Sequence, residues 1–535
     1  MTPDDRSVFD QPRAAQLAHD EPPADLRYIT DDRSFLGHPR GLSTLFFTEF
    51  WERYSYYGIR PLLVLFMTAA LFSGGLGFDR NAASAIVGIY ASSVYLASLP
   101  GGWIADRWLG LRNSVFWGGV LIALGHLAIG LSAIFAHAAF FVGLILIVMG
   151  TGMLKPNISA LVGDLYPAGG ARQDSGFAIF YLGINLGGAV APIVSGALQE
   201  RYGWHWGFGA AGVGMLVGVI MYRLRAPKTL GPIGMEPSGT PAQQRRVRNI
   251  TLGVVALVAV LVALALAGIV PVSPLAIAER MTIVIFTLAL AYFAYLFFGA
   301  GLDRDERKRT VVILVLFIFS ACFWSAYEQA PTSLNLFAKD FTDRHIGSFE
   351  VPIVWLQSAT PIFVVVLSGV FAAIWSALAR RGIDFSSPAK FAFALFCAGV
   401  SYLIMVAATN RVIAGGGVGV KVSMWWLIVT YLLQVIGELA LSPVGLSSVT
   451  KLAPRRFVGQ MMGVWFMSIA LGNLVAGLIG GNVDPNKLAE MPALFQRTAT
   501  SLFVATALLA LLVIPIRNMM RTSVADGASG IGPTG

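Results

Sequence analysis

The sequence predicts an all-α integral membrane protein. Of its 535 residues, 56% are hydrophobic and only 13% are charged, whereas soluble domains average about 25% charged residues. Apolar runs long enough for the roughly 20 residues of a membrane-spanning helix recur from Leu42 to Arg521. An open sheet would leave backbone groups unpaired in lipid, so we expect these runs to be helices.

About fourteen such spans are expected. They cover residues 42–73, 82–108, 113–136, 138–165, 174–199, 205–224, 249–270, 275–299, 310–338, 350–379, 387–409, 422–450, 456–481 and 494–517. The connections between most of them are short and charged, which is typical of a chain that crosses the membrane repeatedly.

Basic residues are unevenly divided between the two sides of this array. Most of the 38 Lys and Arg residues lie in the connections of one side and in the two tails. The opposite side holds only Arg80, Arg201, Arg280, Lys339, Arg344, Arg411, Lys421, Lys487 and Arg497. Basic loops stay in the cytoplasm, so both termini are expected there, which requires an even number of spans. The net charge of +9 therefore does not indicate nucleic acid as a partner.

The spans fall into two groups of six. The expected segments are a cytoplasmic N-terminal tail (1–41, expected to be mobile), an N-terminal six-helix bundle (42–225), a linker (226–248), an inserted hairpin (249–299), a charged linker (300–309), a C-terminal six-helix bundle (310–521) and a cytoplasmic tail (522–535). The hairpin is almost purely apolar, so both of its helices are expected to face lipid. The N-terminal tail has no hydrophobic stretch, and we expect no cleavable signal.

The connection after the second span supports this layout. It reads Gly101-Gly-Trp-Ile-Ala-Asp106-Arg107-Trp-Leu-Gly110-Leu-Arg112. This resembles the G-x-x-x-D-R-x-x-G-R loop of the major facilitator superfamily. The resemblance implies the major facilitator fold, with two six-helix bundles and here an inserted two-helix hairpin. We expect a tight turn whose Asp–Arg pair can hold and release a neighbouring helix end.

Seven charged residues inside the predicted spans stand out as candidates for mid-membrane positions. An ionised side chain at mid-membrane costs about 2.5–3.5 kcal/mol, so each is a functional candidate. They are Glu49, Glu52, Arg53, Arg60, Lys155, Glu328 and Glu438. Four carboxylates against three cations leave one carboxylate over, and its natural partner is a proton or a cationic amine.

The first span carries four of these charges. Glu49, Glu52, Arg53, Tyr56 and Arg60 have the i, i+3, i+4, i+7, i+11 spacing of one helical face. A polar stripe on a spanning helix lines water or protein, although a structural ion-pair network would also account for Glu49 and Arg53.

The other three charges lie close to prolines. Lys155 precedes Pro156, Glu328 comes shortly before Pro331, and Glu438 shares a face with Gln434 and Ser442, which Pro443 follows. Because proline kinks helices and broken helices line binding sites in membranes, we expect helix breaks at these points.

Two longer motifs resemble those of one family. Glu49-Phe-Trp-Glu52-Arg53-Tyr-Ser-Tyr56-Tyr57-Gly58 is similar to the E-x-x-E-R-[FY]-x-Y-Y-G signature of the proton-dependent oligopeptide transporter (POT/PTR) family. Phe180-Tyr181-Leu-Gly-Ile184-Asn185-Leu-Gly187 is similar to its F-Y-x-x-I-N-x-G motif. The resemblance extends from about residue 40 to 520 and favours the bacterial type. It implies a symporter that imports di- and tripeptides with protons across the inner membrane.

The resemblance also implies roles for individual residues. Proton coupling would involve Glu49, Glu52, Arg53, Lys155 and Glu328. The peptide would contact Arg60, Tyr57, Tyr95, Lys155, Asn185, Trp324, Glu328, Thr360, Glu438, Ser442 and Trp465. Arg60 and Lys155 would hold the peptide carboxylate, Glu438 and Ser442 its amino group, and Arg60–Glu328 would form an extracellular ion pair. Thr360 stands where many bacterial relatives have an Asn, which bears on peptide preference.

Other functions remain as alternatives at this stage. An anion carrier of the same family, nitrate-like, would not need Glu438, and a peptide sensor would bind without transport. An intramembrane protease has only Gly445-Leu-Ser447-Ser in its favour. There is no HExxH motif or metal-ligand pair, so we expect neither enzymatic activity nor a cofactor or metal. The expected partners are peptides, protons and membrane lipid.

Overall fold

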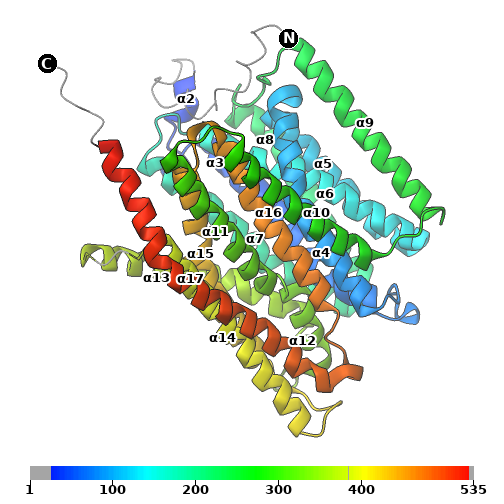
Figure 1. Cartoon of the computed structure of the whole chain (residues 1–535). Coiled ribbons are helices and arrows are strands. Elements are labelled where there is room, and N and C mark those ends of the chain that lie inside the picture. Colours follow the sequence, from blue (N-terminus) through cyan, green and yellow to red (C-terminus); the bar gives the residue numbers. More distant parts are fainter. Residues whose placement is uncertain (1–25, 383–384, 529–535) are drawn as a thin grey trace, which may run out of the picture. The chain divides into compact units, whose positions relative to one another are not determined.

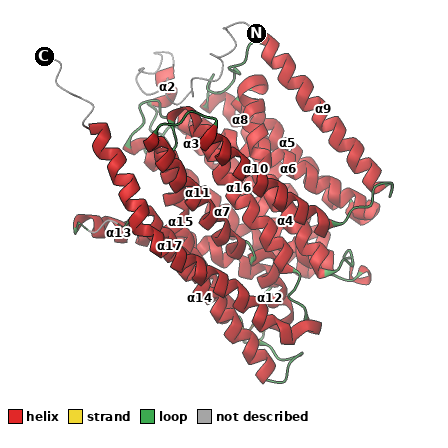
Figure 2. Ribbon diagram, in the orientation of Figure 1, coloured by secondary structure: helices red, strands yellow, loops and turns green. Residues whose placement is uncertain are grey.

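The computed structural model describes residues 26–382 and 385–528, with only the backbone described at 135–137 and 517–528. The described chain consists of helices joined by short loops (Figures 1 and 2). Most of the predicted tail 1–41, namely residues 1–25, lies outside the described residues, as do residues 529–535.

The prediction of an all-helical membrane fold is confirmed. Thirteen helical segments of the described chain are long and apolar enough to cross a membrane. α3 (Arg40–Thr68) is also long enough, since its 29 residues span about 44 Å, but it carries the charged stripe. Together with α3, these segments correspond to the fourteen expected spans.

The helices group into two compact units. Of the described residues, the first unit contains 26–79, 93–274 and 351–362, and the second contains 80–92, 275–350, 363–382 and 385–528. In the first unit lie α2 (Arg27–Thr30), α3, α5 (Leu111–Gly130), α6 (Ser132–Asp164), α7 (Ala171–Tyr202), α8 (Trp204–Thr229) and α9 (Pro241–Leu266). In the second lie α10 (Pro274–Phe298, from Leu275), α11 (Arg304–Tyr327), α12 (Asn335–Phe341), α14 (Ser387–Ala414), α15 (Trp425–Leu452), α16 (Val458–Gly480) and α17 (Met491–Ala528). Both units contribute to α4 (Arg80–Ile104) and α13 (Ala359–Arg380).

Short elements fill the loops of the second unit. β1 (Thr342–Asp343) pairs in parallel with β4 (Val422–Ser423), and β2 (His345–Ile346) pairs antiparallel with β3 (Phe349–Glu350). Each strand has two residues, so these pairs only fasten loops together.

Glycines bring the helices of the first unit into close contact. α5 packs along α6, where a Cβ at Gly118 would lie 2.6 Å from the carbonyl oxygen of Gly150. α3 packs on α7 and α8, where a Cβ at Gly187 would lie 2.4 Å from the carbonyl oxygen of Phe50. Small residues let helix backbones approach in this way inside a membrane. Glu49, Glu52 and Arg53 of the charged stripe of α3 are buried in this packing.

Only one of the three expected helix breaks is present. α11 ends at Tyr327, and a π-helical turn over Ala330–Leu334 follows Glu328. α6 continues through Pro156 and α15 continues through Pro443, so the breaks expected beside Lys155 and Glu438 were wrong. A proline removes a single backbone donor, and the packed neighbours of a spanning helix can compensate for that loss.

The two helices of the inserted hairpin differ in their packing. Val247 is the only buried residue of α9 in the described structure, as expected for a helix that faces lipid. α10 instead buries one face, where the rings of Phe293 and Phe317 lie 6.0 Å apart and Tyr292 donates a 2.6 Å hydrogen bond to Gln460. α10 therefore packs one face on helices of the second unit, while Ile283, Val284 and Leu288 stay exposed on it.

The linker after α8 is folded against the Asp–Arg loop. Asp106 and Arg107 lie in a π-helical turn (Ala105–Leu109), and the backbone amide of Ser238 donates to the carbonyl of Asp106 at 2.8 Å. Gly110 follows at a φ of 78°, and a Cβ there would lie 2.3 Å from the carbonyl oxygen of Met235. The turn therefore needs glycine both for its conformation and for this close approach.

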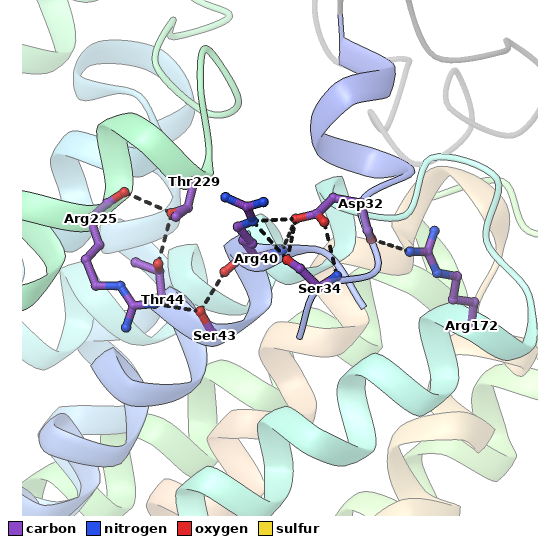
Figure 3. Close-up of polar contacts among 8 residues, drawn as sticks. All are labelled: Asp32, Ser34, Arg40, Ser43, Thr44, Arg172, Arg225 and Thr229. Carbon is purple, nitrogen blue, oxygen red and sulfur yellow. Dashed lines mark hydrogen bonds and ion pairs between the residues drawn. The ribbon is translucent and has the colours of Figure 1, made fainter. Parts of the chain in front are cut away.

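Residues 26–38 form an N-terminal clasp on the first unit. Arg172 of α7 donates to the carbonyl of Thr30 at 2.9 Å. It also donates to the carbonyl of Asp32 at 2.7 Å (Figure 3). His38 lies 2.8 Å from the Tyr166 hydroxyl and 3.3 Å from that of Ser175. Burial and then the Arg172 charge lower the pKa of His38, so its imidazole is neutral at pH 7. The clasp belongs to the segment predicted as a mobile tail, but the backbone carbonyls of Thr30 and Asp32 accept hydrogen bonds from Arg172.

Arg172→Ala is expected to open the clasp. A hydrogen bond from a charged donor contributes about 1.5–3 kcal/mol, so amide hydrogen exchange over residues 27–38 should accelerate roughly tenfold or more. Mass-spectrometric hydrogen exchange at pH 7 measures this, with Arg201→Ala at the other end of α7 as control. Unchanged exchange in Arg172→Ala would show that Arg172 does not hold the segment.

Candidate functional site

Three charged side chains of α3 are buried together in the first unit. Glu52 is 0% exposed, Glu49 1% and Arg53 3%. Arg53 donates from Nη2 to Glu52 Oε1 at 2.6 Å and from Nε to Glu52 Oε2, and its Nε lies 3.4 Å from Glu49 Oε1. The spacing in the sequence placed these residues on one face, and the structure brings them into direct contact.

Glu49 is the less fully paired of the two carboxylates. Its Oε2 atom is buried, and no described residue lies within hydrogen-bond distance of it. Burying an ionised carboxylate is costly unless its oxygens are paired, and a proton removes that cost. Glu52, by contrast, is paired through both oxygens with Arg53. Glu49 is therefore the group of this cluster that is best arranged to take up and release a proton.

The stripe continues through an aromatic ring. The Arg53 guanidinium carbon lies 4.9 Å from the centroid of Tyr56, and that of Arg60 lies 5.8 Å from the same centroid. Tyr56 is buried and Arg60 is half-buried. A ring between two guanidinium groups stabilises both by cation–π attraction. The sequence predicts no role for Tyr56 in the site. Its position in the polar stripe of α3 was the feature from which such a role could have been predicted.

Lys155 faces Tyr95 across two helices. Its amine lies 4.8 Å from the centroid of the Tyr95 ring. α4 and α6 meet closely here, because a Cβ at Gly152 would lie 2.7 Å from the carbonyl oxygen of Ala97. No carboxylate of the described residues lies at ion-pair distance from Lys155, although the residue is close enough for its charge to act on Glu49. Its ammonium group can therefore receive an anion.

Tyr57 and Asn185 are two further candidate site residues in the first unit. A Cβ at Gly188 of α7 would lie 3.0 Å from the Tyr57 ring and 3.4 Å from the Cβ of Pro361, which follows Thr360 in α13. Asn185 is 8% exposed, and its Nδ2 donates to the carbonyl of Tyr181 at 3.0 Å. The amide oxygen of Asn185 is thus the atom that remains to accept a bond from a ligand.

A second group of candidate residues lies in the second unit. Tyr327 donates from its hydroxyl to Glu438 Oε2 at 2.5 Å, and its ring lies 5.2 Å from that of Trp324. Glu438 and Ser442 are both half-buried on α15. The contact between Tyr327 and Glu438 was missed in the sequence, because 111 positions separate the two residues.

The remaining candidates differ in their surroundings. Trp324 is 5% exposed, and its indole N–H has no acceptor among the described residues, so it can donate to a ligand. Trp465 is 3% exposed and packs so tightly on α15 that a Cβ at Gly445 would lie 2.0 Å from its ring. Glu328, 5% exposed, caps the C-terminus of α11.

Neither unit suggests metal chemistry. The described residues contain no group of three His, Cys, Asp or Glu side chains that could hold a metal ion. His126 is 2% exposed on α5, where a Cβ at Gly212 of α8 would lie 2.9 Å from its own Cβ. The described site thus consists of carboxylates, cations, aromatic side chains and the polar side chains of Asn185, Ser442 and Thr360.

Known proteins resemble the chain over most of its length. The sequence profile of the POT family matches residues 112–491. A peptide transporter, YePEPT, of Yersinia enterocolitica subsp. palearctica is 48% identical over 497 residues, which cover 92% of this chain and 97% of that protein. A di-/tripeptide transporter of Lactococcus lactis subsp. cremoris is 39% identical, covering 82% of this chain and 88% of the relative.

Solved structures agree with these sequence matches. The crystal structure of a variant of a peptide transporter, POT, in complex with alafosfalin superposes with a TM-score of 0.84 at 37% identity, covering 93% of this chain and 99% of that one. The family predicted from the motifs is thereby confirmed, as is the prediction that the chain is a transporter and not an enzyme. The chain belongs to the POT family of membrane transporters.

Proposed function

We propose that the chain is a proton-coupled symporter that imports di- and tripeptides by alternating access. The observation that carries this proposal is the buried cluster of Glu49, Glu52 and Arg53, in which one carboxylate oxygen has no described partner. Two of its relatives are named as transporters of peptides or of di- and tripeptides, which supports peptide as the substrate. The membrane is the cytoplasmic membrane of a bacterium, with both termini on the cytoplasmic side.

The two ends of a peptide require opposite charges. A dipeptide is a zwitterion, so its site needs a cation for the carboxylate and an anion for the amino group. Lys155 and Arg60 would hold the carboxylate, while Glu438, oriented by Tyr327, would hold the amino group with Ser442. An anion carrier would have no use for Glu438 at this position.

The uncharged parts of the peptide need hydrogen bonds and apolar walls. Asn185 would accept a bond from the peptide amide through its oxygen, and Trp324 would donate one through its indole N–H. Tyr57, Tyr95, Thr360 and Trp465 would line the side-chain pockets. Because the side chain of Thr360 is shorter than that of Asn and has one polar atom where an amide has two, it would alter which peptides are preferred.

Coupling would proceed through Glu49. With Glu49 protonated, its charge would no longer attract the Lys155 ammonium, which would bind the peptide carboxylate. After the peptide leaves and Glu49 gives its proton to the cytoplasm, the Glu49 carboxylate would attract Lys155. Arg60 and Glu328 would form an ion pair that closes the extracellular side during this cycle.

Uptake by proteoliposomes tests the proposed function. Labelled dialanine should accumulate when an inward proton gradient is imposed, and unlabelled di- and tripeptides should compete with it. Nitrate should not compete. Binding of dialanine without any accumulation or counterflow would instead identify a sensor and contradict the proposal.

A further inference from the structure

A basic pocket lies between the ends of α5 and α8 in the first unit, apart from the candidate site. It has a volume of about 240 Å³. It is lined by Arg112, Asn113, Phe116, Trp117, Tyr222, Arg223, Ala226 and Pro227. The lining therefore combines two cations with three aromatic rings and includes no carboxylate.

The two arginines of the pocket are held by different contacts. Arg112 donates from Nη1 to the carbonyl of Gly231, and its own carbonyl accepts a 3.3 Å hydrogen bond from the buried hydroxyl of Tyr222. Arg223 lies on α8 with its guanidinium carbon 5.8 Å from the centroid of Phe116. Each guanidinium group has five N–H donors, so both keep donors for a ligand. The geometry favours an anion that accepts bonds from both helices.

An apolar surface runs from the pocket along both helices. On α8, Leu216 and Ile220 are each 50% exposed and precede Arg223 at helical spacing on one face. On α5, Trp117 is 51% exposed and Leu124, seven residues further, is 47% exposed. Both helices are long and apolar enough to cross a membrane. The pocket thus stands at one end of a surface that is suited to hydrocarbon chains.

We propose that this pocket binds the phosphate headgroup of an anionic phospholipid whose acyl chains lie along α5 and α8. Arginine pairs with phosphate through two parallel hydrogen bonds, and tryptophan is enriched where a helix passes the lipid headgroups. Basic pockets between helices are suited to anionic lipid headgroups. A free phosphate ion would use the same arginines but would leave the adjoining apolar surface without a partner. This inference does not depend on the proposed transport function.

Lipid retention by the purified full-length protein tests the proposal. Native mass spectrometry would compare bound phosphatidylglycerol with phosphatidylcholine, which has the same acyl chains and no net charge. Arg223→Gln and Arg112→Gln should each weaken phosphatidylglycerol binding about fivefold, since a basic residue near a lipid surface contributes about 1 kcal/mol. Arg112→Lys keeps the charge and should recover part of the binding that Arg112→Gln loses, which separates loss of the charge from loss of the fold. Lys228→Gln, also on α8 but outside the lining, is the matched control and should bind like the wild type.

Inorganic phosphate distinguishes the two sources of the anion. The proposal holds if excess phosphate leaves phosphatidylglycerol bound and only the two pocket arginines affect retention. Displacement of the lipid by phosphate, with the same dependence on the arginines, would assign the pocket to a free anion. Equal retention of both lipids, or equal retention by Arg223→Gln and Lys228→Gln, would also overturn the proposal.

Discussion

Glu49→Gln is expected to abolish proton-driven accumulation of peptide while leaving counterflow measurable. Glutamine has nearly the shape of glutamate but cannot take up or release a proton. Arg53 would keep its two contacts with Glu52, so the buried cation remains paired and the fold is retained. The variant should therefore still bind and exchange peptide but lose its link to the proton gradient.

The measurement is uptake of labelled dialanine into proteoliposomes. One coupled proton and an inward gradient of one pH unit should support about tenfold accumulation, whereas Glu49→Gln should only equalise the two concentrations. Glu279→Gln, an exposed carboxylate of α10, is the matched control and should accumulate like the wild type. The assignment of Glu49 fails if Glu49→Gln concentrates dialanine as the wild type does.

Lys155→Ala and Glu438→Ala are expected to weaken dipeptide binding by about 10–100-fold each. A hydrogen bond between charged groups contributes about 1.5–3 kcal/mol, and every 1.4 kcal/mol corresponds to a factor of ten in affinity. Lys155 has no carboxylate partner among the described residues, and Glu438 is held by the Tyr327 hydroxyl. Removal of either side chain should leave one end of the peptide without a partner.

Chemically blocked peptides separate the two ends in this test. Amidation of the peptide carboxylate should greatly weaken binding to the wild type but should hardly change binding to Lys155→Ala. Acetylation of the peptide amine should likewise weaken binding to the wild type but hardly change binding to Glu438→Ala. Such loss of additivity identifies the groups that interact. If both variants discriminate blocked from free peptides as strongly as the wild type, these residues do not bind the ends of the substrate.

The membrane fold was predictable because its causes are local. Low charge density and apolar runs of spanning length require helices in lipid, and the motifs around Glu49 and Asn185 predicted the family. The contact between Glu49 and Arg53 also follows from spacing, since i and i+4 side chains meet on one helix. These residues belong to one element and need no tertiary information.

Contacts between helices could not be predicted in the same way. Tyr95 meets Lys155, and Tyr327 meets Glu438, because glycines and packing decide which helix faces approach. The breaks expected at Pro156 and Pro443 were wrong for a similar reason, since tertiary packing maintained both helices. The packing of α10 was also missed, because an apolar helix can equally face lipid or protein.

The electrical signature of transport tests proton symport most directly. A neutral dipeptide carries no net charge, so each coupled proton moves one positive charge inward. One charge moving through 100 mV gains about 2.3 kcal/mol, which supports roughly 50-fold accumulation per proton. An acidic dipeptide brings an extra negative charge, which cancels this gain when one proton moves.

The decisive measurement is the current during dialanine uptake at fixed pH, with an inside-negative potential imposed on proteoliposomes. Proton symport predicts an inward current that grows with the potential, a higher rate of dialanine uptake, and a smaller effect of the same potential on an acidic dipeptide. Dialanine uptake without current, at a rate independent of the potential, would contradict proton symport and leave exchange or passive transport.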